Sequence, residues 1–142
     1  MDVDRFVEEA FKIDARLRYL AVVDDGFHVL ISKMRPGVES LTPDEVQKNF
    51  EQLVTPLVMD ALAKLEPYLG ELYSATLRYR KLLLLLYKQG NRIIVTSFEP
   101  EVGDTYIKVV LNKLAHLTSE HLGFLQRLPR PKHDTPPGEK QS

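Results

Sequence analysis

The histidines near the carboxyl end of this sequence are the residues whose type and spacing come nearest to a metal site. His116, Glu120 and His121 form the string HLTSEH, which is one residue longer than the His-x-x-Glu-His motif of some zinc enzymes. On a helix, His116 and Glu120 share a face, while His121 lies about 140° around the axis. A catalytic zinc ion needs three protein ligands. The spacing therefore indicates a solvated helix end, and we predict no bound metal.

His28 is the other candidate for acid–base chemistry. It falls in an expected strand, on the same face as Leu30, and the sequence shows no partner that would make it a general base. The chain has no cysteine and no serine in a Gly-x-Ser-x-Gly context. Neither a GxGxxG nor a Walker-type glycine loop occurs. We therefore expect a protein that is not an enzyme and that binds no cofactor.

A group of basic residues with interleaved tyrosines follows the expected third strand. Its members are Arg78, Arg80, Lys81, Lys88 and Arg92, with Tyr79 and Tyr87 between them. Cations beside aromatic rings hold phosphates or single-stranded nucleic acid, so the group is a candidate anion-binding patch. Strand ends also carry Lys and Arg for solubility and against edge pairing. The formal net charge of −1, from 19 basic and 20 acidic residues, favours this second interpretation and argues against nucleic acid.

Length and composition indicate one domain with a real core. The chain has 142 residues, of which 44% are hydrophobic and 27% charged. The absence of cysteine fits a reducing compartment, and the acidic, amphipathic amino terminus is not a signal peptide. The longest apolar run, residues 82–86, is far shorter than the ~20 residues of a membrane helix. We therefore expect a cytoplasmic protein without a membrane segment.

The first part of the sequence predicts a helix and a hairpin. Apolar residues recur at helical spacing over residues 2–13. Two runs rich in β-branched and aromatic residues follow, at 15–23 and 27–34, and Asp24, Asp25 and Gly26 form a turn signal between them. Such a short connection predicts antiparallel neighbours.

A long central helix should follow. Thr42 and Glu45 match a capping box, and the helical period of apolar residues then continues until Pro67. Pro56 lies inside this stretch, where it removes one backbone hydrogen bond, so we expect a kink near Thr55.

The last part predicts three strands, a helix and a tail. Residues 72–79 alternate in polarity, 82–87 are almost continuously apolar, and 92–98 form the last strand. A helix should begin near Asp104, where the acid can cap it. Residues 129–142 are rich in proline and hold no large apolar side chain, which predicts a disordered tail behind a folded domain of residues 1–128.

The element order, α-β-β-α-β-β-β-α, fits one antiparallel sheet with the strand order 2-1-5-4-3. The apolar fourth strand then lies inside the sheet, and the second and third strands form its edges. The fold class is therefore α/β in the α+β sense, with helices covering a five-stranded sheet.

This order is shared by roadblock/longin-type, profilin-like and PAS-type domains, and the extra first helix with one long central helix most resembles roadblock/LC7. Residues 14–30, 34–41 and 92–103 also resemble a family of small uncharacterised archaeal proteins of ammonia-oxidising archaea. The roadblock resemblance implies a homodimeric scaffold that regulates a partner protein such as a small GTPase. A PAS-like sensor of a small ligand and a nucleic-acid-associated factor that uses the basic group are the alternatives.

The residues themselves also favour a dimer. The strand at 72–79 has no charge before Arg78, although bare edge strands invite pairing. The central helix is more apolar than one covered face requires. A two-fold axis that pairs the strand and the helix with their copies explains both features. The expected interface residues are Val54, Val58, Met59, Leu62, Tyr73, Ala75 and Leu77.

Overall fold

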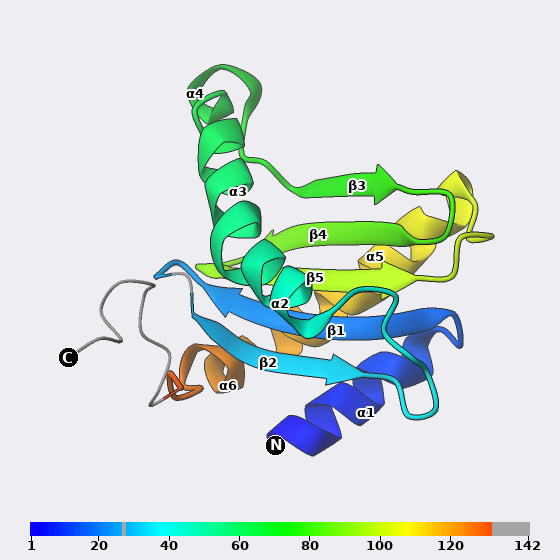
Figure 1. Cartoon of the computed structure of the whole chain (residues 1–142). Helices are drawn as coiled ribbons and strands as arrows, with labels where there is room; N and C mark the ends of the chain where they lie inside the picture. Colours follow the sequence, from blue (N-terminus) through cyan, green and yellow to red (C-terminus); the bar gives the residue numbers. More distant parts are fainter. Residues whose placement is uncertain (27, 132–142) are drawn as a thin grey trace.

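Helices and strands follow one another along the chain in the order that the hydrophobic patterns predict. The computed structural model describes residues 1–26 and 28–131. The elements are α1 (Val3–Ile13), β1 (Leu17–Asp24), β2 (Val29–Met34), α2 (Asp44–Asn49), η1 (Phe50–Val54), α3 (Thr55–Ala63), α4 (Glu66–Leu69), β3 (Ser74–Arg78), β4 (Leu83–Gln89), β5 (Arg92–Phe98), α5 (Asp104–Glu120) and α6 (Leu122–Gln126). The strands form one antiparallel sheet in the order β2-β1-β5-β4-β3 (Figure 1). The predicted fold class and strand order are confirmed.

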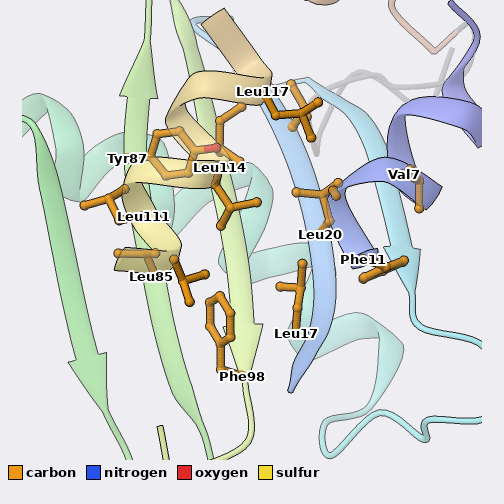
Figure 2. Packing of buried hydrophobic residues seen from close by; sticks show 14 of the residues in the cluster. Val7, Phe11, Leu17, Leu20, Leu85, Tyr87, Phe98, Leu111, Leu114 and Leu117 are labelled. Atoms are coloured by element: carbon orange, nitrogen blue, oxygen red, sulfur yellow. The ribbon is translucent and has the colours of Figure 1, made fainter. Parts of the chain in front are cut away.

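The main core lies between the sheet and the pair of helices α1 and α5. Leu114 of α5 and Val7 of α1 pack in the same cluster as Leu20 of β1 and Leu85 of β4 (Figure 2). Phe98 closes the cluster at the end of β5, where it is fully buried. Two helices thus cover this face of the sheet.

The opposite face is covered only by the central segment, which runs across the strands as α2, η1 and α3 (Figure 1). Met59 of this segment is buried against Tyr19, Leu86 and Val95 of the sheet in a second, smaller cluster. Beyond this contact, α3 and α4 continue past β3, so that their end projects over the edge of the sheet (Figure 1). One face of the molecule is therefore only partly covered by its own chain.

The expected kink in the central helix takes the form of a π-helical turn. Five residues, Phe50–Val54, form the π-helix η1 immediately before the turn that contains Pro56. A π turn contains one extra residue, which accommodates a proline without breaking the helix. The capping box was wrong, because Thr42 precedes the N-cap position, and its hydroxyl donates to Gln47 Oε1 over 2.9 Å.

The two hairpins follow the turn signals of the sequence. At the turn between β4 and β5, Gly90 has φ +60°, a conformation that glycine adopts without strain. The turn between β1 and β2 is closed by Asp24, whose amide donates to the carbonyl oxygen of His28. Strand β2 begins at Val29, two residues later than expected, and residue 27 lies outside the described residues.

The start of the predicted tail is attached to this first hairpin. Asp24 is 1% exposed, and its carboxylate accepts hydrogen bonds from the amides of Gly26 and His28. Arg130 completes the set, with Nε 2.9 Å from Asp24 Oδ2. The predicted disorder of 132–142 lies outside the described residues. We propose that the folded domain extends to Arg130 rather than ending at residue 128.

Two truncations separate these boundaries. Removal of residues 132–142 should leave the melting temperature unchanged, because the Asp24–Arg130 pair stays intact. Removal of 129–142 should lower it by a few degrees, since losing a partner of a buried carboxylate costs about 1 kcal/mol or more. Arg130→Ala in the full chain is the control and should reproduce most of the loss in a thermal melt. Equal melting temperatures for both truncations would return the boundary to residue 128.

Candidate functional site

The histidine residues singled out in the sequence do not converge on one site. His116 Nε2 lies 2.7 Å from Glu120 Oε1, and both side chains are exposed on α5. His121 turns towards α1, where it approaches Glu9 at 3.6 Å and meets the ring of Phe6 edge-on. Among the described residues, no group of three or more metal-ligating side chains gathers. The HLTSEH string therefore faces two directions.

His28 does have a carboxylate partner, which sequence reasoning missed. Its Nδ1 lies 3.1 Å from Oδ1 of Asp24, four residues earlier across the hairpin turn. Burial raises the pKa of Asp24, but hydrogen bonds from the His28 amide, Arg130 and the His28 ring outweigh this and hold the pKa below its usual value. An aspartate that orients an imidazole is one half of a general-base arrangement. Here the same aspartate also holds the turn and Arg130, so the pair has a structural use.

The five basic residues are separated by the length of a strand. Arg78 pairs with Leu83 at one end of β4, and Arg92 pairs with Gln89 at the other end. Six residues of strand span about 20 Å. Arg80 and Lys81 follow Arg78 in the connection from β3 to β4, whereas Lys88 lies near Arg92. The structure does not bring them together as one patch.

The two arginines of this group at the strand ends bind the protein itself. Arg92 is buried and donates to the carbonyl oxygens of Leu125 and Gln126, which attaches α6 to the sheet. Arg78 donates to the carbonyl oxygen of Val102 and to Asp104 Oδ1 at the start of α5. Of the five, Arg80 and Lys81 are left as exposed neighbours beside the apolar surface described below.

A buried carboxyl group lies beneath the central helix. Glu51, in the π turn, is 2% exposed, and no salt bridge joins it to a cation of the described residues. Gln47 Nε2 donates to its Oε1 over 2.8 Å, and the Tyr19 hydroxyl contacts the same oxygen. The Tyr19 hydroxyl also lies 2.6 Å from Ser32 Oγ. Burial raises the pKa of Glu51 to about 7.

The hydrogen-bond network around Glu51 was not predicted from the sequence, because the sequence pattern gives little indication that Glu51 is buried. A glutamate within a helical run normally faces water, and the extra residue of a π turn changes which side of the helix each following residue faces. A cavity of about 350 Å³ adjoins Glu51 and is lined by Ser32, Asp44, Glu45, Gln47 and Lys48 as well. In the network of Glu51, Tyr19, Gln47 and Ser32, hydrogen-bond donors and acceptors are already in place. The Glu51 carboxyl group, with a pKa of about 7, is the member that exchanges a proton most readily near neutral pH.

Exposed apolar side chains are concentrated along the central segment and continue into β3 and the connection after it. They are Leu41, Val46, Leu53, Val54, Leu57, Val58, Leu62, Leu65, Tyr68, Leu69, Tyr73, Leu77 and Tyr79. Single exposed apolar residues are ordinary, but a concentration of this size on one segment and the strand after it is typical of an interaction surface. We call this set the central apolar surface.

Most of the expected interface residues belong to the central apolar surface. They are Val54, Val58, Leu62, Tyr73 and Leu77, and Ala75 is half-buried beside them. Met59 does not belong, because it is 2% exposed and packs on the sheet within one chain. We therefore propose an interface without Met59.

Strand β3 joins this surface to the sheet. In its register with β4, Ala75 is opposite Leu86 and Leu77 is opposite Leu84. Residues opposite each other in an antiparallel pair point to the same face. Leu86 packs on the side of the central helix, so Ala75 and Leu77 face that side too. Strand β3 is also an edge of the sheet, with β4 as its neighbour.

An apolar groove lies between α2 and the end of this sheet face. It encloses about 350 Å³ and is lined by Leu41, Thr42, Val46, Gln47, Phe50, Tyr79, Lys81, Leu82, Leu84 and Val95. One wall therefore comes from α2, the other from the connection between β3 and β4, and the floor from the sheet. We refer to it as the α2 groove.

Comparison with known proteins identifies the architecture. No protein-family model and no curated protein matches the sequence. Solved structures do match: the gliding protein MglB of Thermus thermophilus aligns with a TM-score of 0.65 at 18% identity, over 82% of this chain and 85% of that chain. The chain has a roadblock fold. The predicted roadblock resemblance is thereby confirmed for the fold, since identities this low carry nothing further.

Two more structures agree. The roadblock/LC7 domain from Streptomyces avermitilis matches with a TM-score of 0.63 and 10% identity, over 89% of this chain and 99% of that chain. Myxococcus xanthus MglB matches with a TM-score of 0.63 and 13% identity, over 88% and 95%. The part of this chain that the structure describes holds no helix with both the length and the apolar character needed to cross a bilayer.

The raised pKa of Glu51 predicts a pH dependence of stability. Between its ordinary value of 4.5 and about 7, the folded chain keeps this proton while the unfolded chain releases it. The free energy of unfolding should therefore fall as pH rises through this window, by about 3 kcal/mol at most, and level off above it. Urea unfolding at pH 5, 6, 7 and 8 measures the slope.

Two variants assign this slope to Glu51. Glu51→Gln should flatten the dependence, because the amide keeps a donor and an acceptor but does not ionise. Glu8→Gln on the exposed side of α1 is the control and should retain the slope. Parallel curves for Glu51→Gln and the unmodified chain would show that Glu51 does not titrate in this window.

Proposed function

We propose that this chain is a non-enzymatic roadblock-type module that forms a homodimer and acts as a scaffold regulating a partner protein. The partner class that the roadblock resemblance implies is a small GTPase. The fold supports the proposal, and one matching structure is described as MglB with tetrameric arrangement, at 19% identity and a TM-score of 0.57. Such a module works through its surface rather than through a catalytic centre.

The observation that carries the proposal is that the central apolar surface includes side chains of both the central segment and the edge strand β3. Val58 of α3 and Leu77 of β3 are both exposed. A two-fold axis beside β3 would pair that strand with its copy and place the two α3 helices side by side. Such an isologous contact removes the bare strand edge and the apolar side chains from water together.

The alternatives have less support. A small-ligand sensor would use the α2 groove, whose volume of about 350 Å³ is near the lower end for ligand pockets, but the groove opens on the surface. A nucleic-acid function would use the basic group, which the length of β4 divides into two parts. The dimeric scaffold accounts for more of the exposed apolar side chains than either alternative.

Light scattering tests the dimer directly. The unmodified chain should have twice its mass of 16.3 kDa at micromolar concentration. Ala75→Glu or Val58→Glu should give monomers, because each places two like charges near the two-fold axis in a desolvated contact. Val109→Glu is the matched control, since Val109 is exposed on α5 across the sheet. A monomer of the unmodified chain would contradict the proposal.

The partner class has its own test. The purified dimer would be mixed with small GTPases encoded in the same genome, and GTP hydrolysis and complex formation would be measured. We expect one of them to bind the dimer and to change its hydrolysis rate at least tenfold. The monomeric Val58→Glu form should lose the effect, and the Val109→Glu form should retain it. No binding by any of them would leave a dimeric scaffold for another class of partner.

A further inference from the structure

The projecting end of the central segment, residues 66–71, carries two exposed apolar side chains, and we call it the tip. Tyr68 and Leu69 of α4 are 84% and 77% exposed, the highest values among the exposed large apolar side chains of the described residues. The backbone beneath them is well bonded, since the Gly70 amide donates to the Glu66 carbonyl oxygen. The Glu66 carboxylate also accepts from the Leu72 amide over 2.6 Å. The tip thus holds two large apolar side chains in water on an ordered turn.

The tip and the α2 groove carry opposite charges. Residues 66–71 begin with Glu66 and end with Glu71, so a carboxylate lies on each side of the two apolar side chains. The connection that walls the groove carries Arg80 and Lys81, both exposed. An apolar contact with a rim of complementary charges is the usual composition of a specific interface.

The two-fold dimer brings the tip and the groove of different chains together. The tip precedes β3 and projects over the sheet edge at the Ser74 end of that strand (Figure 1). In antiparallel self-pairing, the Ser74 end of one β3 lies beside the Arg78 end of its copy. The connection that follows Arg78 is the wall of the α2 groove. The tip of each chain therefore points to the α2 groove of the other chain.

We infer that residues 66–71 of each copy dock into the α2 groove of the second copy, with Tyr68 and Leu69 in the groove and Glu71 near Lys81. This inference rests on the proposed dimer and adds a second, reciprocal contact to it. It also assigns a role to Arg80 and Lys81, the two basic residues that remain exposed beside the groove. Each groove is incomplete without the partner's tip.

Cysteine pairing between two chains tests the docking, because the chain has no cysteine of its own. Leu69→Cys and Lys81→Cys forms with different tags would be coexpressed and mildly oxidised. A disulfide between the two tags is expected, and coexpression of Leu69→Cys with Val109→Cys on α5 should give none. If the chain is a dimer and Ala75→Glu breaks it, absence of the 69–81 disulfide would overturn the docking and leave the strand-edge dimer standing.

Charge reversal provides a readout in the unoxidised protein. Lys81→Glu should raise the dimer dissociation constant about tenfold in sedimentation equilibrium, and Glu71→Lys in the same chain should restore it, because both contacts are then reversed together. Lys108→Glu, which is exposed next to Val109 on α5 across the sheet, is the control and should have no effect. Failure of the second change to restore affinity would overturn the pairing of Glu71 with Lys81, and a monomeric unmodified chain would overturn both the docking and the dimer.

Discussion

The unequal covering of the two faces of the sheet is the constraint on which the rest of this structure depends. A sheet buries an apolar face only as far as helices cover it. Strand β4 has seven residues and is therefore about 23 Å long, whereas a helix with its side chains is about 10 Å wide. Helices α1 and α5 together cover one face, but the central segment crosses the other face alone (Figure 1). Apolar sheet and helix surface must remain exposed beside it.

The central segment meets this constraint with an unusual local structure. Its π turn contains Glu51 and directly precedes the helical turn that holds Pro56, so one irregularity accommodates a proline and directs a carboxyl group at the sheet. The buried carboxyl group is tolerated because Tyr19 and Gln47 contact it. Its pKa is raised to about 7, so below that pH it is mostly neutral and avoids the cost of a buried charge. The helix is thereby anchored by a polar contact on one side while its apolar side chains remain free on others.

The charged pairs of the described residues make structural contacts within the fold. Asp24 with His28, Arg78 with Asp104, and Arg92 with the end of α6 each close a turn or fasten an element. These pairs stabilise the fold. The roadblock fold by itself does not indicate a catalytic activity, because one fold can serve many functions. The exposed large apolar side chains lie mostly on the central segment and β3, and this concentration supports the proposed protein interface.

Much of the fold was determined by local patterns that the sequence shows directly. The alternation over residues 72–79, the apolar run after it and the turn at Gly90 specify strands and their order because each depends on a few neighbouring residues. The candidate surface was partly predictable for the same reason, since an over-wide helical stripe and an uncharged edge strand are both readable from spacing. Met59 shows the limit, because its burial depends on where the helix meets the sheet.

Only the tertiary structure decided which side chains meet. Asp24 and Arg130 are 106 residues apart in sequence, and no periodicity connects them. Arg78 and Arg92 are near each other in sequence but are separated by the length of β4, because that whole strand lies between them in the chain. Pro56 predicted an irregularity in the central helix, but not that it would be a π turn that directs Glu51 inward. Secondary structure follows from short-range preference, whereas partners, separations and the phase of a distorted helix follow from how the whole chain closes around its core.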